Sequence, residues 1–523
     1  MLRSTFLGFQ TASRALTASQ ICIDVTGNNI ANADTEGYTR QRVDLVSISS
    51  GGYSQKYMVT GASVGYGVAA DGISQLRDPF LDLRFRTENA ESGKLETIVS
   101  GLSDLENIFD ETTSEGLQTQ LTNLLTQLQT FSNTPTSSDI ASIVRTAAQQ
   151  VAQIMNTYSQ QIDQVRDQEI YGLKTSTVEN DFNSLVKNIA SLNEQIREDQ
   201  THGNPSNELM DRRNTLIDEL SKLANIQVSS TPVKISESIT IDRVSISLYD
   251  ASTGTSIGLV DDALYNTLSV DTTGDAVSID LNSSFGAHET KDITDHITGG
   301  AIKGYLDIIN GGGAFADETA GENTFKGVPY YKATLDTFAA KFAQVFNDMN
   351  ALEDTSTTPS TITPKPLFEA SDGGTEITAG NIQLTDAWLD DATYLTTTKD
   401  PDASSGGSDN ILKMIQAMNS GHTFLVDPAD SSSILFEGSF EQFVSGTISD
   451  LALDVSLHQS YTETSGTVLS NLFNERESLS GVSLDEEGVN LLAYEKAYNA
   501  AARFMTVIDE AVDTLLSMGL VGR

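Results

Sequence analysis

The chain has 523 residues, and its 72 acidic and 31 basic residues give a formal net charge of −41. A surface of this sign repels phosphate backbones and anionic lipids, which disfavours binding to nucleic acid or membranes. Cys22 is the only cysteine, so neither an internal disulfide nor a thiolate metal cluster can form. No apolar run approaches the roughly 18–20 residues of a membrane span, and no conventional signal peptide is visible. The length predicts about two to four domains.

The first 33 residues read as one long helix with a coiled-coil pattern. Large apolar residues recur every seven positions, and a small residue follows each of them by three. The large residues are Leu2, Phe9, Leu16, Ile23 and Ile30, and the small ones are Thr5, Ala12, Ser19, Thr26 and Ala33. This pattern predicts a helix that packs along another helix.

The far end of the chain carries the same kind of pattern. One step-seven row is Leu484, Leu491, Tyr498, Met505 and Val512, and a second is Tyr494, Ala501, Ile508 and Leu515. Neither terminal helix has a partner in its own segment, so we expect the two to pair with each other. Burying five large side chains yields on the order of 10 kcal/mol. Ordering about 30 residues costs roughly 1–2 kcal/mol each. The cost of ordering the chain exceeds the gain from burial, which predicts that residues 1–35 and 480–523 are disordered in the free monomer.

Between the termini the periodicity changes several times. Strand and loop over 38–76 precede a helix that begins at Pro79 with Asp78 as its N-cap. Helix continues to about 225, with one apolar stripe at Leu117, Leu121, Leu124, Leu128 and Phe131 and another at Ile143, Ala147, Val151, Ile154, Tyr158, Ile162 and Val165. A period of two then predicts β structure to about 325, with a turn at 250–254. A helix returns near 330, loops occupy 351–410, and helices resume from 411.

This order predicts a mainly α protein with a β-rich insertion nested in the chain. We expect a terminal coiled-coil assembly domain (1–65 and 480–523), a helical middle domain (66–225 and 330–479) and a β-rich outer domain (226–329). Nesting predicts a rod with both termini at one end. It also predicts that the insertion lies farthest from the termini, faces outward and is dispensable for assembly.

The sequence offers no catalytic or metal-binding constellation. The five histidines are scattered, and only His288 and His296 are close in the chain, where surface loop positions explain them best. The acidic stretch 427–441 lacks the spacing of a calcium loop. The glycines of "INGGGAF" lack the lysine and hydroxyl residue of a phosphate-binding loop. We therefore expect neither an enzyme nor a cofactor.

One polar motif needs its own explanation. Asn28, Asn29 and Asn32 lie near the end of the first helix, and Asn28 and Asn32 share one face. Amides both donate and accept, so identical copies could interlock through them. Alternatively, they are helix caps and turn residues, with Gly37 adopting a positive φ angle. The residue chemistry leaves both interpretations open.

A family resemblance narrows the function. The segment "NNIANADTEGYTRQRVDL" (28–45) resembles the N-terminal signature of bacterial flagellar rod, hook and hook-associated proteins. The segments "LNEQIREDQTHGNPSNELMDRRNTLIDELSKLANIQV" (192–228) and "LSGVSLDEEGVNLLAYEKAYNAAARFMTVIDEAVDTLL" (479–516) are similar to the first hook-associated proteins within that family. The resemblance covers the chain except the β-rich insertion and 351–410.

This resemblance implies a structural subunit of the extracellular flagellum, secreted by the flagellar type III apparatus without a cofactor. It implies a ring of eleven copies between the hook protein and the second junction protein, and an export chaperone before assembly. The candidate interface residues are the two terminal heptad patterns together with Asn28, Asn29, Asn32, Gly37 and Tyr38 of the motif. Alternatives are another axial protein of hook or filament type, a surface adhesin, or an enzyme with a wall-hydrolase domain.

Overall fold

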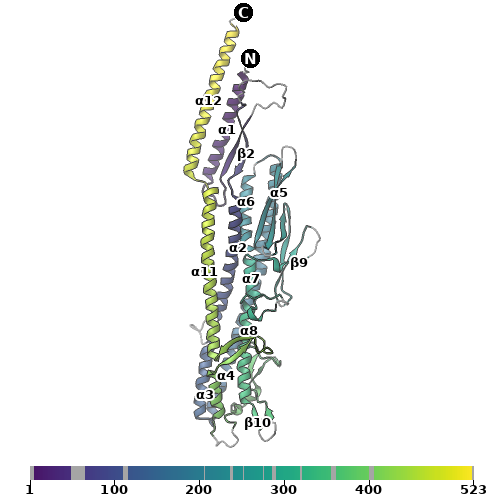
Figure 1. Ribbon diagram of the computed structural model, residues 1–523, viewed down its shortest axis with the longest axis vertical. Helices are drawn as coiled ribbons and strands as arrows, with labels where there is room; N and C mark the ends of the chain where they lie inside the picture. Colours follow the sequence, from purple (N-terminus) through teal and green to yellow (C-terminus); the bar gives the residue numbers. More distant parts are fainter. Residues whose placement is uncertain are drawn as a thin grey trace.

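A computed structural model describes residues 5–48, 65–109, 116–204, 206–235, 240–250, 253–274, 276–285, 290–317, 321–354, 361–399 and 406–520. The molecule is a long rod with both chain ends at the same tip (Figure 1). The mainly α fold with β-rich insertions agrees with the sequence pattern. No helix in the described part of the chain has the length and apolarity needed to span a bilayer.

The tip of the rod is formed by the two terminal helices and a hairpin. Helix α1 (Thr5–Ala31) runs antiparallel to α12 (Leu484–Leu520), and the hairpin of β1 (Gln41–Ser47) and β2 (Val68–Gln75) packs beside them (Figure 1). Gly8 faces Ile508 so closely that a Cβ on Gly8 would lie 3.0 Å from that side chain. The terminal helices therefore pair as predicted. Polar contacts, which the apolar balance omitted, hold both helices to the rest of the molecule. The expected disorder of residues 1–35 and 480–523 in the free monomer stays a prediction.

The residues buried on the two terminal helices are not simply the large apolar residues of the heptad patterns. On α1 the buried positions include the small residues Ala12, Ala18 and Cys22, whereas Phe9 of the bulky row is 46% exposed. On α12, Ala501 is buried but Tyr498 is 38% exposed. Small residues allow the two backbones to approach closely. Phe9 and Tyr498 are left exposed on the outside of the pair, whereas other large heptad residues, such as Ile508, contact the partner helix.

The body of the rod is built around long helices. Helix α2 (Pro79–Phe109) lies along α11 (Phe440–Ser480), and α6 (Asn207–Leu223) packs on α2. Helix α2 begins as predicted, with the Phe80 N–H donating to the Asp78 carboxylate at 2.8 Å. Helix α11 begins with a reciprocal cap, in which the Ser439 hydroxyl accepts from the Gln442 N–H and the Gln442 side chain accepts from the Ser439 N–H.

The end opposite the termini holds the larger hydrophobic core. Its helices are α3 (Leu117–Asn133), α4 (Ser138–Tyr171), α8 (Val328–Asn350), α9 (Asp386–Asp390) and α10 (Asp409–Asn419). Its hairpins pair β10 (Leu352–Asp354) with β11 (Thr361–Thr363), β12 (Phe368–Ala370) with β13 (Ile382–Leu384), and β14 (His422–Leu425) with β15 (Ile434–Gly438). A 3₁₀ turn, η6 (Ala392–Tyr394), follows α9. All members of the first predicted stripe are buried, and in the second Ile143 is exposed.

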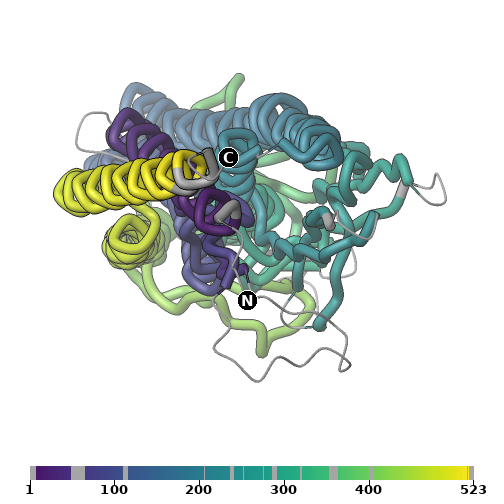
Figure 2. The backbone as a smooth tube through the Cα atoms, turned by 90° about the horizontal axis from the view of Figure 1, so that it is seen from above, coloured from purple at the N-terminus to yellow at the C-terminus, as the bar shows by residue number. Residues whose placement is uncertain are grey.

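The second core joins strands to helices along the middle of the rod. One sheet contains β3 (Ile226–Lys234), β4 (Thr240–Asp250), β5 (Thr255–Asp261) and β6 (Leu264–Tyr265), and the other contains β7 (Thr267–Asp271), β8 (Ser278–Asn282) and β9 (Thr290–Asp292). The helical side consists of the π-helix η2 (Gly172–Phe182), α5 (Asn183–Thr201), α6 and α7 (Ala301–Ile309), and η3 (Thr294–His296) and η4 (Gly313–Phe315) are short 3₁₀ turns. Seen from above, the strands lie to one side of the helices (Figure 2).

Three predictions about the fold need correction. The β-rich segment faces outward but flanks the middle of the rod, and α3, α4 and β10 lie farthest from the termini (Figure 1). Residues 301–309 inside the expected β region form helix α7, which packs on α2. Residues 422–438, inside an expected helical region, contribute the β14–β15 hairpin. The nesting of the chain was right, but position along a rod follows packing and not the distance from the ends in sequence.

Candidate assembly site

Asn29 is the central polar residue where the terminal module is closed. Its side chain is 1% exposed. The amide oxygen accepts from the Gln41 backbone N–H at 3.0 Å and from the Tyr38 hydroxyl at 2.8 Å. The amide nitrogen donates to the Gln41 backbone carbonyl at 2.9 Å and to Glu487 at 3.3 Å. A carboxamide is required because one small group must both donate and accept.

The other two asparagines make contacts close in sequence. The Asn32 amide donates to the carbonyl and the side-chain oxygen of Asn28, both at 3.0 Å, and accepts from the Thr35 hydroxyl. Gly37 has φ +76°, as predicted, and a Cβ there would lie 2.6 Å from the Thr215 hydroxyl. Asn28 and Asn32 thus act as end-of-helix and turn residues in the chain, and an additional role between subunits stays a prediction.

Arg40 fastens the start of β1 to the start of α12. Its guanidinium contacts Glu486 at 2.8 Å and Glu487 at 2.7 Å. Its backbone N–H donates to the Ser480 carbonyl at 2.8 Å, at the break between α11 and α12. Burial lowers the pKa of Arg40, but the hydrogen bonds and charges of the two glutamates outweigh it and raise that pKa overall. The carboxylates in the first turn of α12 also suit the positive end of the helix dipole.

The hairpin is held to the body by the first turns of α6. Asp211 accepts from the Thr39 backbone N–H at 3.1 Å and from the Gln75 amide at 2.8 Å. Burial, opposed by the bonds to Thr39, raises the pKa of Asp211. Burial first, and then the charges of Asp211, Glu208 and Glu487, raise the pKa of Tyr38 to about 12. Tyr38 therefore stays a neutral hydrogen-bond donor at physiological pH.

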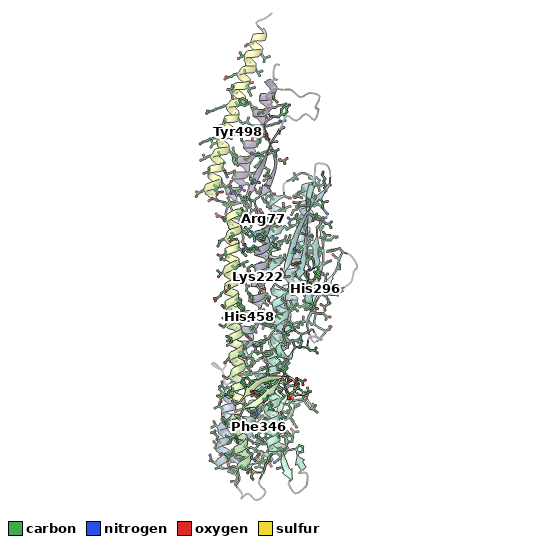
Figure 3. All side chains as sticks on the ribbon, in the orientation of Figure 1. Arg77, Lys222, His296, Phe346, His458 and Tyr498 are labelled. Atoms are coloured by element: carbon green, nitrogen blue, oxygen red, sulfur yellow. The ribbon has the colours of Figure 1, made fainter. Side chains whose placement is uncertain are left out.

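Below this joint, three helices meet at a cluster of arginines and aspartates. Arg476 of α11 contacts Asp82 of α2 at 3.2 Å and Asp218 of α6 at 2.8 Å. Arg77 binds Asp82 through two hydrogen bonds, and Arg86 contacts Asp218 at 2.7 Å. Figure 3 shows Arg77 at the level where the terminal module joins the body, below Tyr498 on α12. Burial raises the pKa of Asp82, but the surrounding arginines lower it overall.

The predicted interface residues divide into two groups. Tyr494 and Ile508 are half-buried toward α1, as are Leu491, Met505 and Val512 along the pair, and Leu16, Ile23 and Ile30 are half-buried on α1. Leu484, Tyr498 and Phe9 are exposed. Leu2 and the side chain of Leu515 lie outside the described residues. The structure thus brings the terminal helices together but does not bury the whole heptad pattern.

The sequence analysis missed the polar residues of the joint. Arg40, Gln41, Asp211, Arg476 and Glu487 come from three distant parts of the chain, and Asn29 and Glu487 are separated by 458 positions. The cluster of acidic residues at the start of α12 was visible, but no spacing rule connects it to the residues that follow α1. Such pairings are found only when the segments are placed in space.

The side chains of this joint make hydrogen bonds and ion pairs. Within the described residues, no group of three or more histidine, cysteine or carboxylate side chains is placed to hold a metal ion. The outer surface of α12 instead exposes large apolar side chains, namely Leu484, Val489, Leu492, Tyr498, Phe504, Val507 and Leu516. Exposed apolar patches are typical of surfaces that bind a partner.

A rod with antiparallel terminal helices, closed by the asparagine motif and leaving apolar side chains outside, has the architecture of an axial flagellar protein. Residues 9–39 match the flagella basal body rod protein family, and residues 476–518 match the C-terminal family of flagellar basal body rod FlgEFG proteins. Residues 102–359 match the helical domain of the flagellar hook-associated protein FlgK.

Full-length relatives place the chain more narrowly. It is 30% identical to flagellar hook-associated protein 1 of Bacillus subtilis over 100% of both chains, and 25% identical to that of Escherichia coli over 97% of this chain and 98% of the relative. The chain belongs to the flagellar hook-associated protein 1 family. The structure of the flagellar hook junction protein FlgK from Burkholderia pseudomallei shares the fold, with a TM-score of 0.55 and 14% identity over 76% of this chain and 100% of the other.

Proposed function

We propose that the protein is the structural subunit that joins the flagellar hook to the filament. In this proposal it is exported by the type III apparatus, delivered by an export chaperone and added as a ring at the hook tip outside the cell. Its neighbours are the hook protein on one side and the second junction protein on the other. Copies of the chain contact each other around the ring.

The observation that supports this proposal most strongly is the unfinished surface of the terminal pair. Side chains such as Leu492, Phe504 and Val507 face outward on α12 and would cost free energy in water. These exposed side chains do not stabilise a monomer, whereas the proposed ring would bury them at every contact between copies. The full-length similarity to hook-associated proteins supports placing that ring in the flagellum.

The proposal contains no catalytic step and no cofactor. The curated relatives carry names of structural flagellar components and not of enzymes. The terminal module, the middle helices and the β-rich segment then correspond to the three proposed domains, 1–65 with 480–523, 66–225 with 330–479, and 226–329. The structure shows strong packing between the last two, because the strands share a core with α5, α6 and η2.

Electron microscopy of a deletion strain tests the junction role directly. Cells without the protein should make hooks that lack filaments and should release filament protein into the medium. Expression of the wild-type chain should restore filament attachment. Normal filaments in the deletion strain would contradict the proposal.

A surface variant tests the part played by α12. Replacing Leu492 and Phe504 by serine should leave secretion and the body fold intact but prevent filament attachment. The matched control is Ile434→Ser, which alters an equally exposed apolar residue on β15 in the body. Attachment that is lost equally in both variants would remove the specific role assigned to α12.

A further inference from the structure

A polar pocket lies in the body of the rod, where α2, the end of α4 and α7 meet. Its volume is about 420 Å³, and its walls include Glu96 and Thr97 from α2, Glu169 from α4 and Tyr305 from α7. The π-helix η2 begins at this point, and a Cβ on its first residue, Gly172, would lie 3.2 Å from the Tyr305 hydroxyl. π-Helices are rare and are often found at functional sites. The pocket therefore coincides with a change of helix type within one long helical segment.

Glu169 is the residue that indicates a ligand. It is only 6% exposed, yet no hydrogen bond or ion pair from the described residues engages its carboxylate. The side chain is not sealed in a core, because it forms part of the pocket wall. A carboxylate in such a place without a partner costs free energy. A group that enters the pocket and donates hydrogen bonds to Glu169 would therefore be stabilised there.

The charges around Glu169 favour a cation. None of the described residues that line the pocket is basic. Burial first, and then the charge of Asp104 on α2, raise the pKa of Glu169 to about 7. The second carboxylate of the wall, Glu96, contacts Lys222 of α6 at 2.8 Å, and Figure 3 shows Lys222 in the body of the rod. Lys303 of α7 contacts the carboxylate four residues further along its own helix, also at 2.8 Å. The ionised Glu169 is thus the wall charge that lacks compensation.

The polar groups of the wall match an ammonium group better than a metal ion. The Thr97 hydroxyl donates to a backbone carbonyl of α2 at 2.9 Å, and the Gln168 amide nitrogen donates to Asp104 at 3.0 Å. The oxygens of Thr97 and Gln168 can therefore accept, and with Glu169 they offer acceptors for the three donors of an ammonium group. In the described part of the chain, no three carboxylate, histidine or cysteine side chains converge to hold a metal ion.

Two tyrosines complete the wall. Tyr171 is exposed, and Tyr305 is half-buried. Burial raises the pKa of Tyr305, and the charges of Glu169 and Asp181 add to this effect, so its ring stays neutral. The faces of aromatic rings attract cations, and their carbon atoms suit an alkyl stem. A carboxylate beside two such rings is suited to an ammonium group carried on an alkyl chain.

We propose that this pocket binds an alkylammonium group, with the nitrogen at Glu169 and the carbon stem along the tyrosines. A lysine side chain of a neighbouring subunit and a free alkylamine present this same chemistry. The proposal goes beyond the junction role and does not depend on it, because every wall residue belongs to one chain. The ammonium group binds the ionised carboxylate, so it competes with a proton for Glu169.

Calorimetric titration of the full-length free subunit with n-butylammonium tests the pocket, because this probe has the stem length of lysine. At pH 8 we expect saturable binding. The Glu169→Gln chain keeps the side-chain shape but should bind at least about tenfold more weakly, because it loses a hydrogen bond to a charged acceptor. The exposed Glu179→Gln is the matched control and should bind as the wild type does. Equal binding by the wild-type and Glu169→Gln chains, or equal binding of neutral 1-butanol, would overturn the proposal.

The pH dependence separates this pocket from a general attraction of cations to an acidic protein. Because the pKa of Glu169 is about 7, protonation should weaken binding to the wild type about tenfold at pH 6 relative to pH 8. The residual binding of the Glu169→Gln chain should change little over the same range. A wild-type affinity that is the same at both pH values would contradict the assigned competition with a proton.

Zero-length crosslinking identifies the source of the group. A carbodiimide joins a carboxylate to an amine with loss of water. In purified hook–filament particles, a link from Glu169 to a lysine of a neighbouring subunit identifies a side chain as the occupant. Particles that form no such link but bind butylammonium after dialysis identify a free amine. Particles that do neither would refute the proposal. Normal filaments in the deletion strain would remove the junction role alone, because the calorimetric test uses the free subunit.

Discussion

A single amide at position 29 links three parts of the terminal module. It imitates a strand neighbour for Gln41, orients Tyr38 and reaches Glu487 at the start of α12. Its two neighbours in the motif, Asn28 and Asn32, bond mostly to each other. The three asparagines of the motif therefore have different roles. Asn29 is buried, whereas Asn28 and Asn32 are half-buried.

An Asn29→Asp substitution should loosen the terminal pair. The new carboxylate would face Glu487 and the Gln41 carbonyl, which both need a donor. We expect a loss of about 2–3 kcal/mol, because buried polar groups without partners cost roughly 1–3 kcal/mol each. Hydrogen exchange measures this loss of stability as faster exchange of the backbone amides in α1 and β1.

The double variant Asn28→Leu and Asn32→Leu is the matched control. Its lost bonds are local and partly exposed, so exchange in α1 should stay close to that of the wild type. If this variant is secreted but fails to attach filaments, the two amides have a role between subunits. If it behaves as the parent does, they are only caps.

Glu169 makes stability depend on pH. It lies near the end of α4, and burial first and then the charge of Asp104 raise its pKa from 4.5 to about 7. The folded state therefore holds a proton that the unfolded state has lost between these two values, and stability falls as pH rises through this window. The loss is up to about 3 kcal/mol above pH 7, at 1.36 kcal/mol per unit.

Replacing this residue by glutamine removes that loss. The Glu169→Gln chain should melt at a higher temperature than the wild type at pH 8, and the difference should shrink at pH 5. Circular dichroism melts at both pH values measure this. The exposed Glu179→Gln is the control and should show no such dependence on pH. An equal difference at both pH values would refute the assigned ionisation.

At the scale of elements, long helices are positioned by a few charged contacts on their partly apolar faces. Helix α11 extends over 41 residues, but its second half buries few large side chains, with Leu472 as an exception. Arg476 supplies other contacts for this half of the helix. It contacts both Asp82 and Asp218, and its guanidinium lies 4.3 Å from the Phe85 ring centre. The register of α11 against α2 and α6 therefore depends on this side chain.

An Arg476→Met substitution should destabilise the upper half of the rod. Asp82 and Asp218 keep Arg77 and Arg86 as partners, so we expect a moderate cost of about 1–3 kcal/mol. Arg84→Met is the matched control on α2, because Arg84 meets Glu475 at 3.9 Å with both side chains exposed. Its cost should be about 0–1 kcal/mol. Thermal denaturation that ranks the two variants in the opposite order would contradict this account.

At the scale of the whole molecule, the rod is continuous and the β-rich segment is part of its support. Strand residues such as Ile246 and Ile279 share a core with Phe182 of η2 and Val186 of α5. Gly304 of α7 approaches α2 so closely that a Cβ there would lie 2.6 Å from the Lys94 carbonyl oxygen. The segment therefore cannot be treated as a decoration on a finished body.

Replacing residues 226–329 by a short Gly/Ser linker should accordingly impair folding. The exposed face of α5 and η2 would reduce solubility and raise protease sensitivity between 170 and 225. Limited proteolysis and the yield of soluble protein measure this. A soluble, protease-resistant variant that still attaches filaments would show that the segment is dispensable, as its nested position in sequence first suggested.

Local sequence determined the elements that depend on short-range chemistry. The helix start at Asp78 and Pro79, the positive φ of Gly37 and the stripe from Leu117 to Phe131 follow from capping, backbone freedom and periodicity. The heptads at both ends predicted that the termini pair, because each helix lacked a partner nearby. The motif from Asn28 to Leu45 pointed to the flagellar family.

Only the tertiary structure decided which faces of those helices meet and where the insertion lies. Periodicity marks several rows on a helix, and the small residues buried on α1, which include Ala12, Ala18 and Cys22, do not follow any single one of them. The bonds from Asn29 and Arg40 to Glu487 join residues 458 and 447 positions apart, so no local pattern could reveal them. The β-rich segment took the middle of the rod because its apolar strand faces bury against α5, α6 and η2, a match that depends on the shapes of both surfaces.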